Sequence, residues 1–79
     1  MLKLSRHVRN NMRLYGIQMD EPLEAINSPD IIEAESDKIV VIKRFRGRFS
    51  GYPLKAVYKR QGDNTFAITV YPLKKKYRR

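Results

Sequence analysis

The sequence predicts an α+β fold in which two N-terminal helices pack on one face of a four-stranded antiparallel β-meander. Three observations lead to this prediction. Apolar residues recur at helical spacing within residues 1–27. Runs rich in β-branched and aromatic residues follow between positions 38 and 71. The segment QGDN separates the last two runs with residues that suit a hairpin turn. We find no repeat or linker, so residues 1–79 are predicted to form a single domain.

The first predicted helix has clear start and stop signals. Ser5 is a suitable N-cap, and Gly16 suits the left-handed position that follows a helix end. One face of this helix carries Leu4, Val8, Met12 and Tyr15. The opposite face carries Arg6, Arg9 and Arg13, which we interpret as a solvated helix face in preference to a phosphate-binding stripe.

The second predicted helix is short. Asp20 is its expected N-cap, and Pro22 is tolerated in a first turn because its missing N–H would have no partner there. We expect the buried side to consist of Met19, Leu23 and Ile26. The segment Asn27-Ser28-Pro29 ends the helix, since a residue before proline avoids helical angles.

Four strands are expected after this point. A short strand starts within residues 29–33, and three longer strands cover residues 38–46, 52–60 and 65–71. Strict alternation in the last strand would place Phe66, Ile68 and Val70 on the core face. The first long strand is apolar at successive positions, which is typical of a central strand.

Charge is segregated along the chain, whose net charge is +9. Residues 1–19 contain no acid, residues 20–37 contain no base, and Asp63 is the sole acid after position 37. Such a pattern predicts a strongly basic surface set apart from an acidic region. RNA or single-stranded DNA is the first expected partner, an acidic protein the second and an anionic membrane the third.

Composition argues against several other classes of protein. The chain has no cysteine and one histidine, so neither a disulfide nor a zinc site is expected. No glycine-rich phosphate loop is present, and we expect no cofactor. No stretch has the length of a transmembrane helix, and the N-terminus lacks the apolar run of a signal peptide. We therefore expect a cytoplasmic protein.

The candidate nucleic-acid-binding residues belong to the basic C-terminal half. In Arg44-Phe45-Arg46-Gly47-Arg48, an extended backbone would point three guanidinium groups to one side, beside aromatic rings that can stack on bases. The alternative is an edge strand whose charges prevent aggregation. The full set of candidates is Arg44, Arg46, Arg48, Lys55, Lys59, Lys74, Lys75 and Tyr77. The tail could equally be a frayed, solvated terminus.

Several short motifs resemble a family of small bacterial domains of unassigned function. They are Arg6-His7-Val8, Met12-Arg13, Gly16-Ile17, the break at Asn27–Asp30 and the closing Thr69-Val70-Tyr71-Pro72. The layout of a helix pair, a meander and a basic, aromatic end is also similar to the RelE/ParE toxin superfamily, including its BrnT branch. That resemblance implies a toxin-type ribonuclease that cuts messenger RNA, often on the ribosome, and that is silenced by an antitoxin partner.

The resemblance also implies candidate catalytic residues for cleavage without a metal ion. In this reaction the 2′-hydroxyl of the RNA attacks the neighbouring phosphate. Arg44 and Arg46 would stabilise the charged transition state, and Tyr71 would transfer protons. His7 matches the pattern of the small bacterial domains but has no catalytic counterpart in the toxins, and it is the other candidate for proton transfer. A lone histidine at the border of an apolar helix face is more often structural. The alternative function is a non-catalytic module that binds nucleic acid or an acidic, antitoxin-like protein.

Overall fold

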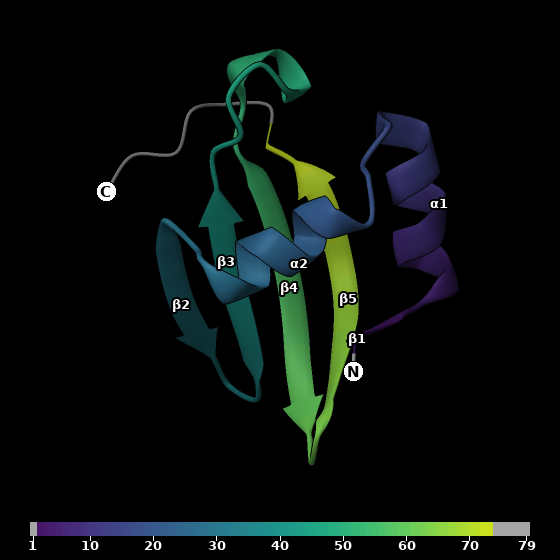
Figure 1. Cartoon of the computed structure of the whole chain (residues 1–79). Helices are drawn as coiled ribbons and strands as arrows, with labels where there is room; N and C mark the ends of the chain where they lie inside the picture. Colours follow the sequence, from purple (N-terminus) through teal and green to yellow (C-terminus); the bar gives the residue numbers. More distant parts are fainter. Residues whose placement is uncertain (1, 74–79) are drawn as a thin grey trace.

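The computed structural model describes residues 2–73 and contains two α-helices and one five-stranded sheet (Figure 1). The helices are α1 (Arg6–Tyr15) and α2 (Asp20–Asn27). The strands are β1 (Leu2–Leu4), β2 (Ile31–Glu35), β3 (Lys38–Lys43), β4 (Leu54–Gln61) and β5 (Asn64–Pro72). The strand order across the sheet is β1-β5-β4-β3-β2.

The predicted four-stranded antiparallel meander is wrong, because the sheet is mixed and has a fifth strand. β1 pairs in parallel with β5, with Leu2 opposite Thr65 and Leu4 opposite Ala67. The other three pairings are antiparallel, as predicted. Leu4 therefore belongs to a strand and not to the first helix. A three-residue strand has too few residues for its alternation to be distinguished from the start of a helix.

The predicted ends of α1 are confirmed. The backbone N–H of Val8 donates to Oγ of Ser5 at 3.1 Å, and Gly16 adopts a left-handed conformation with φ of 66°. Val8 and Met12 are buried, whereas Tyr15 keeps 40% of its surface exposed. The buried stripe of α1 is thus narrower than predicted, because the helix lies along the edge of the sheet beside β5 (Figure 1).

The predicted N-cap and buried face of α2 need correction. Met19 occupies the N-cap, and Asp20 is the first helical residue. Met19 and Leu23 are exposed, whereas Ile26 is partly buried against the core, as predicted. The buried residues are Glu21, Pro22 and Ala25. The carboxylate of Glu21 accepts a hydrogen bond from the backbone N–H of Gln18 at 2.7 Å, so it reaches back over the start of the helix. Glu21, Pro22 and Ala25 thus mark the side of the helix that faces the protein interior.

The strand that was predicted over residues 38–46 ends at Lys43. The chain then forms a loop that includes a 3₁₀ turn at Phe49–Gly51, with Gly47 and Phe49 both at positive φ. These left-handed residues interrupt the extended conformation that would have placed Arg44, Arg46 and Arg48 on one side. The apolar run of β3 behaves as predicted for a central strand, since Val40, Val41 and Ile42 are all buried.

A β-bulge in β5 changes which residues of this strand face the core. Val57 of β4 lies opposite Thr69, and the next residue, Tyr58, lies opposite Ala67. Ile68 therefore has no partner in β4, and the alternation reverses at this point. Val70 is buried in the core as predicted, but Ala67 is buried in place of Phe66 and Ile68, which are partly exposed.

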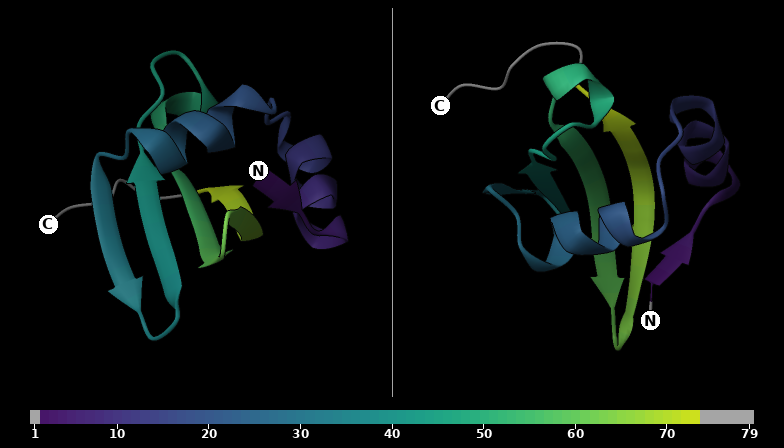
Figure 2. Two further views of the ribbon diagram at one scale, coloured as in Figure 1. Left: turned by 60° about the horizontal axis from the view of Figure 1, so that its bottom comes forward. Right: turned by 45° about the horizontal axis from the view of Figure 1, so that its top comes forward.

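The hydrophobic core lies on one face of the sheet, which we call the helix face. It contains Val41, Leu54, Ala56, Tyr58 and Val70 from the strands, together with Val8, Met12, Ile17 and Ala25 from the helical region. Figure 2 shows α2 crossing this face and α1 at its edge. We call the other side of the sheet the open face, because neither α1 nor α2 covers it. Within residues 2–73, no helix is long and apolar enough to cross a membrane.

Candidate nucleic-acid interface

Successive side chains of β4 alternate between the helix face and the open face of the sheet. Leu54, Ala56 and Tyr58 point into the core, so Lys55, Val57 and Lys59 point to the open face. Register then determines their neighbours. Lys55 lies between Ile42 of β3 and Tyr71 of β5, and Lys59 lies opposite Phe66.

Two aromatic rings on this face each have a lysine beside them. The ammonium group of Lys55 lies 5.8 Å from the centre of the Tyr71 ring, and that of Lys3 lies 5.8 Å from the centre of the Phe66 ring. Both rings are partly exposed. The bulge is the reason that an even-numbered and an odd-numbered aromatic residue of β5 share one face.

The charge on the open face changes from one edge of the sheet to the other. Lys3 of β1 and Lys55 and Lys59 of β4 make one part of the face basic. Glu33 and Glu35 lie in β2 at the far edge, where Lys38 of β3 is opposite Glu35. Val40 and Ile42 of β3 form an apolar strip between the two regions. A polyanion is therefore attracted most strongly to the part of the face made by β4, β5 and β1.

Lys59 also contacts an acid, at the exposed turn between β2 and β3. Its ammonium group lies 3.4 Å from Oδ2 of Asp37. The pKa of Asp37 is lowered, first by a hydrogen bond from its own backbone N–H and then by Lys59. Because Asp37 is exposed, water screens this pair, and a phosphate can compete for the lysine.

Arg44 and Arg46 lie just beyond the end of β3 and are both exposed. The backbone N–H of Arg44 donates to Oδ2 of Asp30 at 2.8 Å, which anchors the chain at this residue. Arg44 also lines a small cavity of about 260 Å³ with Asp30, Ile31, Ile42 and Pro53. Ile31 and Ile42 are cross-strand partners, and the row of paired residues continues through Lys55 to Tyr71.

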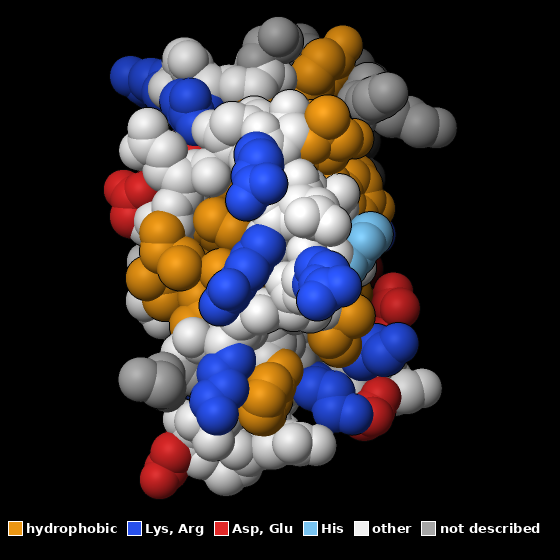
Figure 3. Space-filling view, turned by 90° about the vertical axis from the view of Figure 1, so that its right-hand side faces the viewer, with side chains coloured by type: hydrophobic (Ala, Val, Ile, Leu, Met, Phe, Trp, Pro, Cys, Tyr) orange, Lys and Arg blue, Asp and Glu red, His pale blue; other side chains and the backbone are white. Residues whose placement is uncertain are grey.

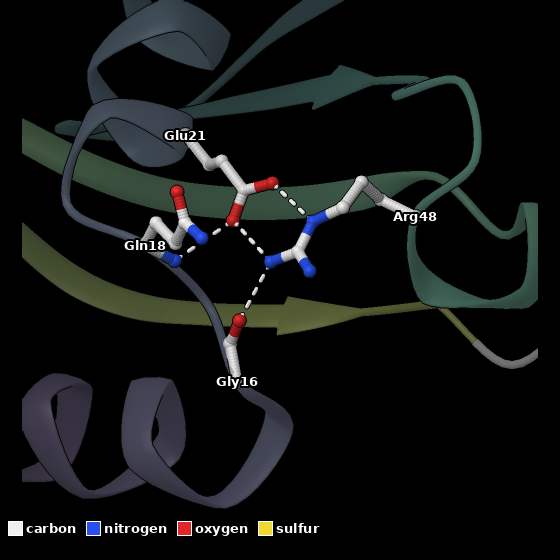
Figure 4. A network of polar contacts seen from close by, with 4 residues as sticks. All are labelled: Gly16, Gln18, Glu21 and Arg48. Atoms are coloured by element: carbon white, nitrogen blue, oxygen red, sulfur yellow. Dashed lines mark hydrogen bonds and ion pairs between the residues drawn. The ribbon is translucent and has the colours of Figure 1, made fainter.

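Arg48 has a different environment from the other two arginines (Figure 4). Its guanidinium group donates to both carboxylate oxygens of Glu21, at 2.7 and 2.8 Å, and to the carbonyl oxygen of Gly16 at 2.6 Å. The group also lies 4.9 Å from the centre of the Phe49 ring. These contacts connect the end of α1, the start of α2 and the loop after β3, which is a structural role.

His7 lies at the opposite edge of the sheet from Arg44. It is exposed, and its Nε2 is 3.5 Å from Nδ2 of Asn11. It lines a groove of about 690 Å³ between the β1–α1 junction and β5; the other lining residues are Lys3, Leu4, Ser5, Phe66, Ala67, Ile68 and Thr69. We call this the β1–β5 groove. It shares no lining residue with the cavity beside Arg44.

Three of the four residues suggested for catalysis thus lie in two regions. Tyr71 is at one end of the row of cross-strand partners that contains Lys55, Arg44 lies beside the other end, and His7 belongs to the β1–β5 groove. Arg46 is exposed in the loop after β3 and lines neither cavity. Lys74, Lys75 and Tyr77 lie outside the described residues. Lys3 and Phe66 were missed as site residues in the sequence. The alternation Leu2-Lys3-Leu4 was the available signal for Lys3, but nothing in the sequence marks the bulge that turns Phe66 outward.

The arginines of α1 add positive charge next to the β1–β5 groove. Arg6, Arg9 and Arg13 are exposed. Figure 3 views the molecule from the side on which α1 lies and shows Lys and Arg side chains over much of it, with few acids. Positive charge therefore extends from the open face around the β1 edge.

Comparison with protein families identifies one match, to a domain of unknown function (DUF4258), over residues 4–72. The chain belongs to this family. No curated protein and no solved structure matches the chain. The DUF4258 match covers both helices and strands β2 to β5. It carries no information on a relationship to RelE/ParE toxins, which stays a prediction.

Proposed function

We propose that this DUF4258 domain binds single-stranded nucleic acid, RNA in the first place, on the open face of its sheet. The observation that carries the proposal is the pairing of partly exposed aromatic rings with lysines on a sheet face that neither α1 nor α2 covers. Aromatic faces stack on unpaired bases, and neighbouring cations contact the phosphates between them. The expected location is the cytoplasm, where RNA is available.

Charge supports the same conclusion. Lys3, Lys55 and Lys59 lie on the open face, Arg44 lines the cavity beside Ile42, and Arg46 is exposed in the loop after β3. Together they would provide about five phosphate contacts. Binding of this kind releases counterions. For single strands, the logarithm of affinity falls with the logarithm of salt concentration with a slope of about −0.7 per contact. We therefore expect a slope of about −3.5.

The test is fluorescence anisotropy of a labelled single-stranded RNA over a series of salt concentrations. Lys55→Gln should weaken binding and flatten the slope by about 0.7. Arg60→Gln is the matched control, because Arg60 is a cation of the same strand whose guanidinium lies near Tyr58, on the helix face. An affinity that does not change with salt, or equal effects of the two substitutions, would contradict the proposal.

Cleavage of messenger RNA without a metal ion is a second candidate function, of the toxin type. This function is favoured by the row of cross-strand partners Tyr71, Lys55 and Ile42, which ends beside Arg44. A phenol and cations that lie along one row can act on the same phosphate. We expect purified protein to cut RNA in the presence of a chelator, and the Arg44→Ala, Tyr71→Phe double variant to be inactive. If RNA stays intact with the wild-type protein, the cleavage function is wrong and only the RNA-binding function remains.

An acidic protein is the alternative partner for the same surface, as for a toxin that is bound by its antitoxin. Affinity purification from the native host, with nuclease treatment before elution, distinguishes the two classes. Nuclease-sensitive recovery of RNA supports the proposal. Recovery of one acidic protein that resists nuclease supports the protein-interaction module.

A further inference from the structure

The β1–β5 groove has the dimensions and the lining of a small-molecule site. At about 690 Å³ it lies within the range of roughly 300–1,000 Å³ that such sites occupy. Two smaller cavities, beside Arg44 and beneath α2, measure about 260 and 210 Å³. Leu4, Ala67 and Ile68 provide apolar walls, and Lys3, His7 and Thr69 provide polar groups.

We infer that the β1–β5 groove holds one unpaired nucleotide of the bound RNA, with its base against Phe66 and its phosphate near Lys3 and His7. This inference rests on the proposed function and specifies the ligand of one part of the same surface. It assigns a role to His7 and to the apolar walls formed by Leu4 and Ala67, which phosphate contacts on the open face do not need.

The geometry of the groove supports a base on one side and a phosphate on the other. Phe66 has the ammonium group of Lys3 5.8 Å from its ring centre, so the stacking surface and the cation are adjacent. Stacking on an aromatic ring is possible for every base, because each base has a π-face. The imidazole of His7 has one contact in the described structure, at 3.5 Å to Asn11, and can therefore turn towards a ligand.

The groove exists because β1 is shorter than β5. β1 covers β5 only from Thr65 to Ala67, and the chain then leaves the sheet to begin α1 at Arg6. Ile68, which has no partner in β4, lies at this point and contributes to the groove wall. Bulges are over-represented at sheet edges and next to functional sites, where they redirect a side chain.

Proton NMR provides a direct test, because the chain has a single histidine whose imidazole signals report on the groove. Adenosine 5′-monophosphate, adenosine and inorganic phosphate are titrated separately. We expect saturable shifts of the His7 signals with the monophosphate at millimolar concentration, and weaker binding of adenosine and of phosphate alone. Phe66→Leu should weaken monophosphate binding roughly 5- to 150-fold, which corresponds to the loss of one stacked base.

Two further variants keep the inference falsifiable if Phe66→Leu fails to fold. Lys3→Gln, at an exposed position, should weaken monophosphate binding by up to roughly fivefold. Arg60→Gln removes a cation that lies on the helix face, outside the groove, and should leave monophosphate binding unchanged. The inference is wrong if the monophosphate does not shift the His7 signals, or if Arg60→Gln and Lys3→Gln have equal effects.

A parallel titration with a ten-nucleotide RNA separates this inference from the proposed function. If the oligonucleotide binds with the expected salt dependence while the monophosphate does not bind, the groove assignment fails and the open face stands. If the oligonucleotide does not bind, the proposed function fails, and so does the assignment of the groove to an RNA nucleotide, whatever the monophosphate does.

Discussion

At the scale of single residues, Glu21 and Arg48 connect three segments that are distant in the sequence. Glu21 is 7% exposed and accepts hydrogen bonds from Arg48 and from the backbone of Gln18. Arg48 also binds the carbonyl oxygen of Gly16, at the end of α1. A buried carboxylate without its cation is costly, because desolvation is then not compensated.

We predict that Arg48→Met destabilises the domain, because it leaves the Glu21 carboxylate without its cation. The loss is smaller than for a fully buried ion pair, because the arginine side chain is 37% exposed and water screens it. Chemical denaturation monitored by circular dichroism measures the difference. Arg46→Met, at an exposed position of the same loop, is the control and should change stability by less than about 0.5 kcal/mol.

The same ion pair makes stability depend on pH. The hydrogen bond from Arg48 lowers the pKa of Glu21 below its ordinary value of 4.5, against the opposing effect of burial. The unfolded chain therefore takes up a proton at higher pH than the folded one. The contribution of Glu21 is fully present above pH 4.5 and is lost as pH falls through the folded-state pKa.

We expect the free energy of unfolding to decrease as pH is lowered from about 5 to 3. In Glu21→Gln the decrease should be smaller, because position 21 no longer titrates. Urea denaturation at a series of pH values measures both curves. Parallel curves for the wild type and the variant would show that Glu21 does not contribute to acid sensitivity.

At the scale of elements, the boundary between β1 and α1 depends on one hydroxyl group. Oγ of Ser5 accepts from the backbone N–H of Val8, which satisfies one of the free donors at the start of α1. The same residue ends β1 and lines the β1–β5 groove. A weaker cap would loosen both the helix and the strand that precedes it.

Ser5→Ala should lower the stability of the domain by about 1 kcal/mol. Ser28→Ala is the matched control, because Ser28 follows α2 and makes its contacts through backbone groups. Thermal denaturation of the two variants should show a lower midpoint for Ser5→Ala alone. Equal midpoints would mean that the cap contributes nothing.

At the scale of the whole molecule, the two faces of the sheet have separate roles. The helix face holds the core, and the open face carries the lysines and exposed rings. A chain of 79 residues buries a modest share of its surface, so its stability depends on few core side chains. Substitutions on the open face should then change binding without changing stability.

Substitutions of two neighbouring residues of β4 test whether the two faces have separate roles. Leu54 is fully buried, and we expect Leu54→Ala to cost about 2–5 kcal/mol, which leaves much of the protein unfolded. Lys55→Gln should stay within about 0.5 kcal/mol of the wild type and yet weaken RNA binding. Denaturation curves and anisotropy titrations on the same samples give both values. A large loss of stability in Lys55→Gln would contradict the separation.

Local signals in the sequence were sufficient to predict those features of the fold that depend only on residues close together in the chain. The cap at Ser5, the stop at Gly16, the proline in α2 and the turn at Gly62 follow from backbone preferences of single residues. The alternation of β4 likewise predicts that Lys55 and Lys59 share a face. These properties are local, so they can be predicted without knowledge of the fold.

Only the tertiary structure decided which distant residues meet. Leu2–Leu4 becomes a strand because β5 offers it a partner more than sixty residues away in the sequence. The bulge at Ile68 brings Phe66 and Tyr71 to the same face, and the pairing of Arg48 with Glu21 gives this arginine a structural role. Register and long-range pairing depend on the packing of the whole domain, whereas helix caps and turns depend on the chemistry of adjacent residues.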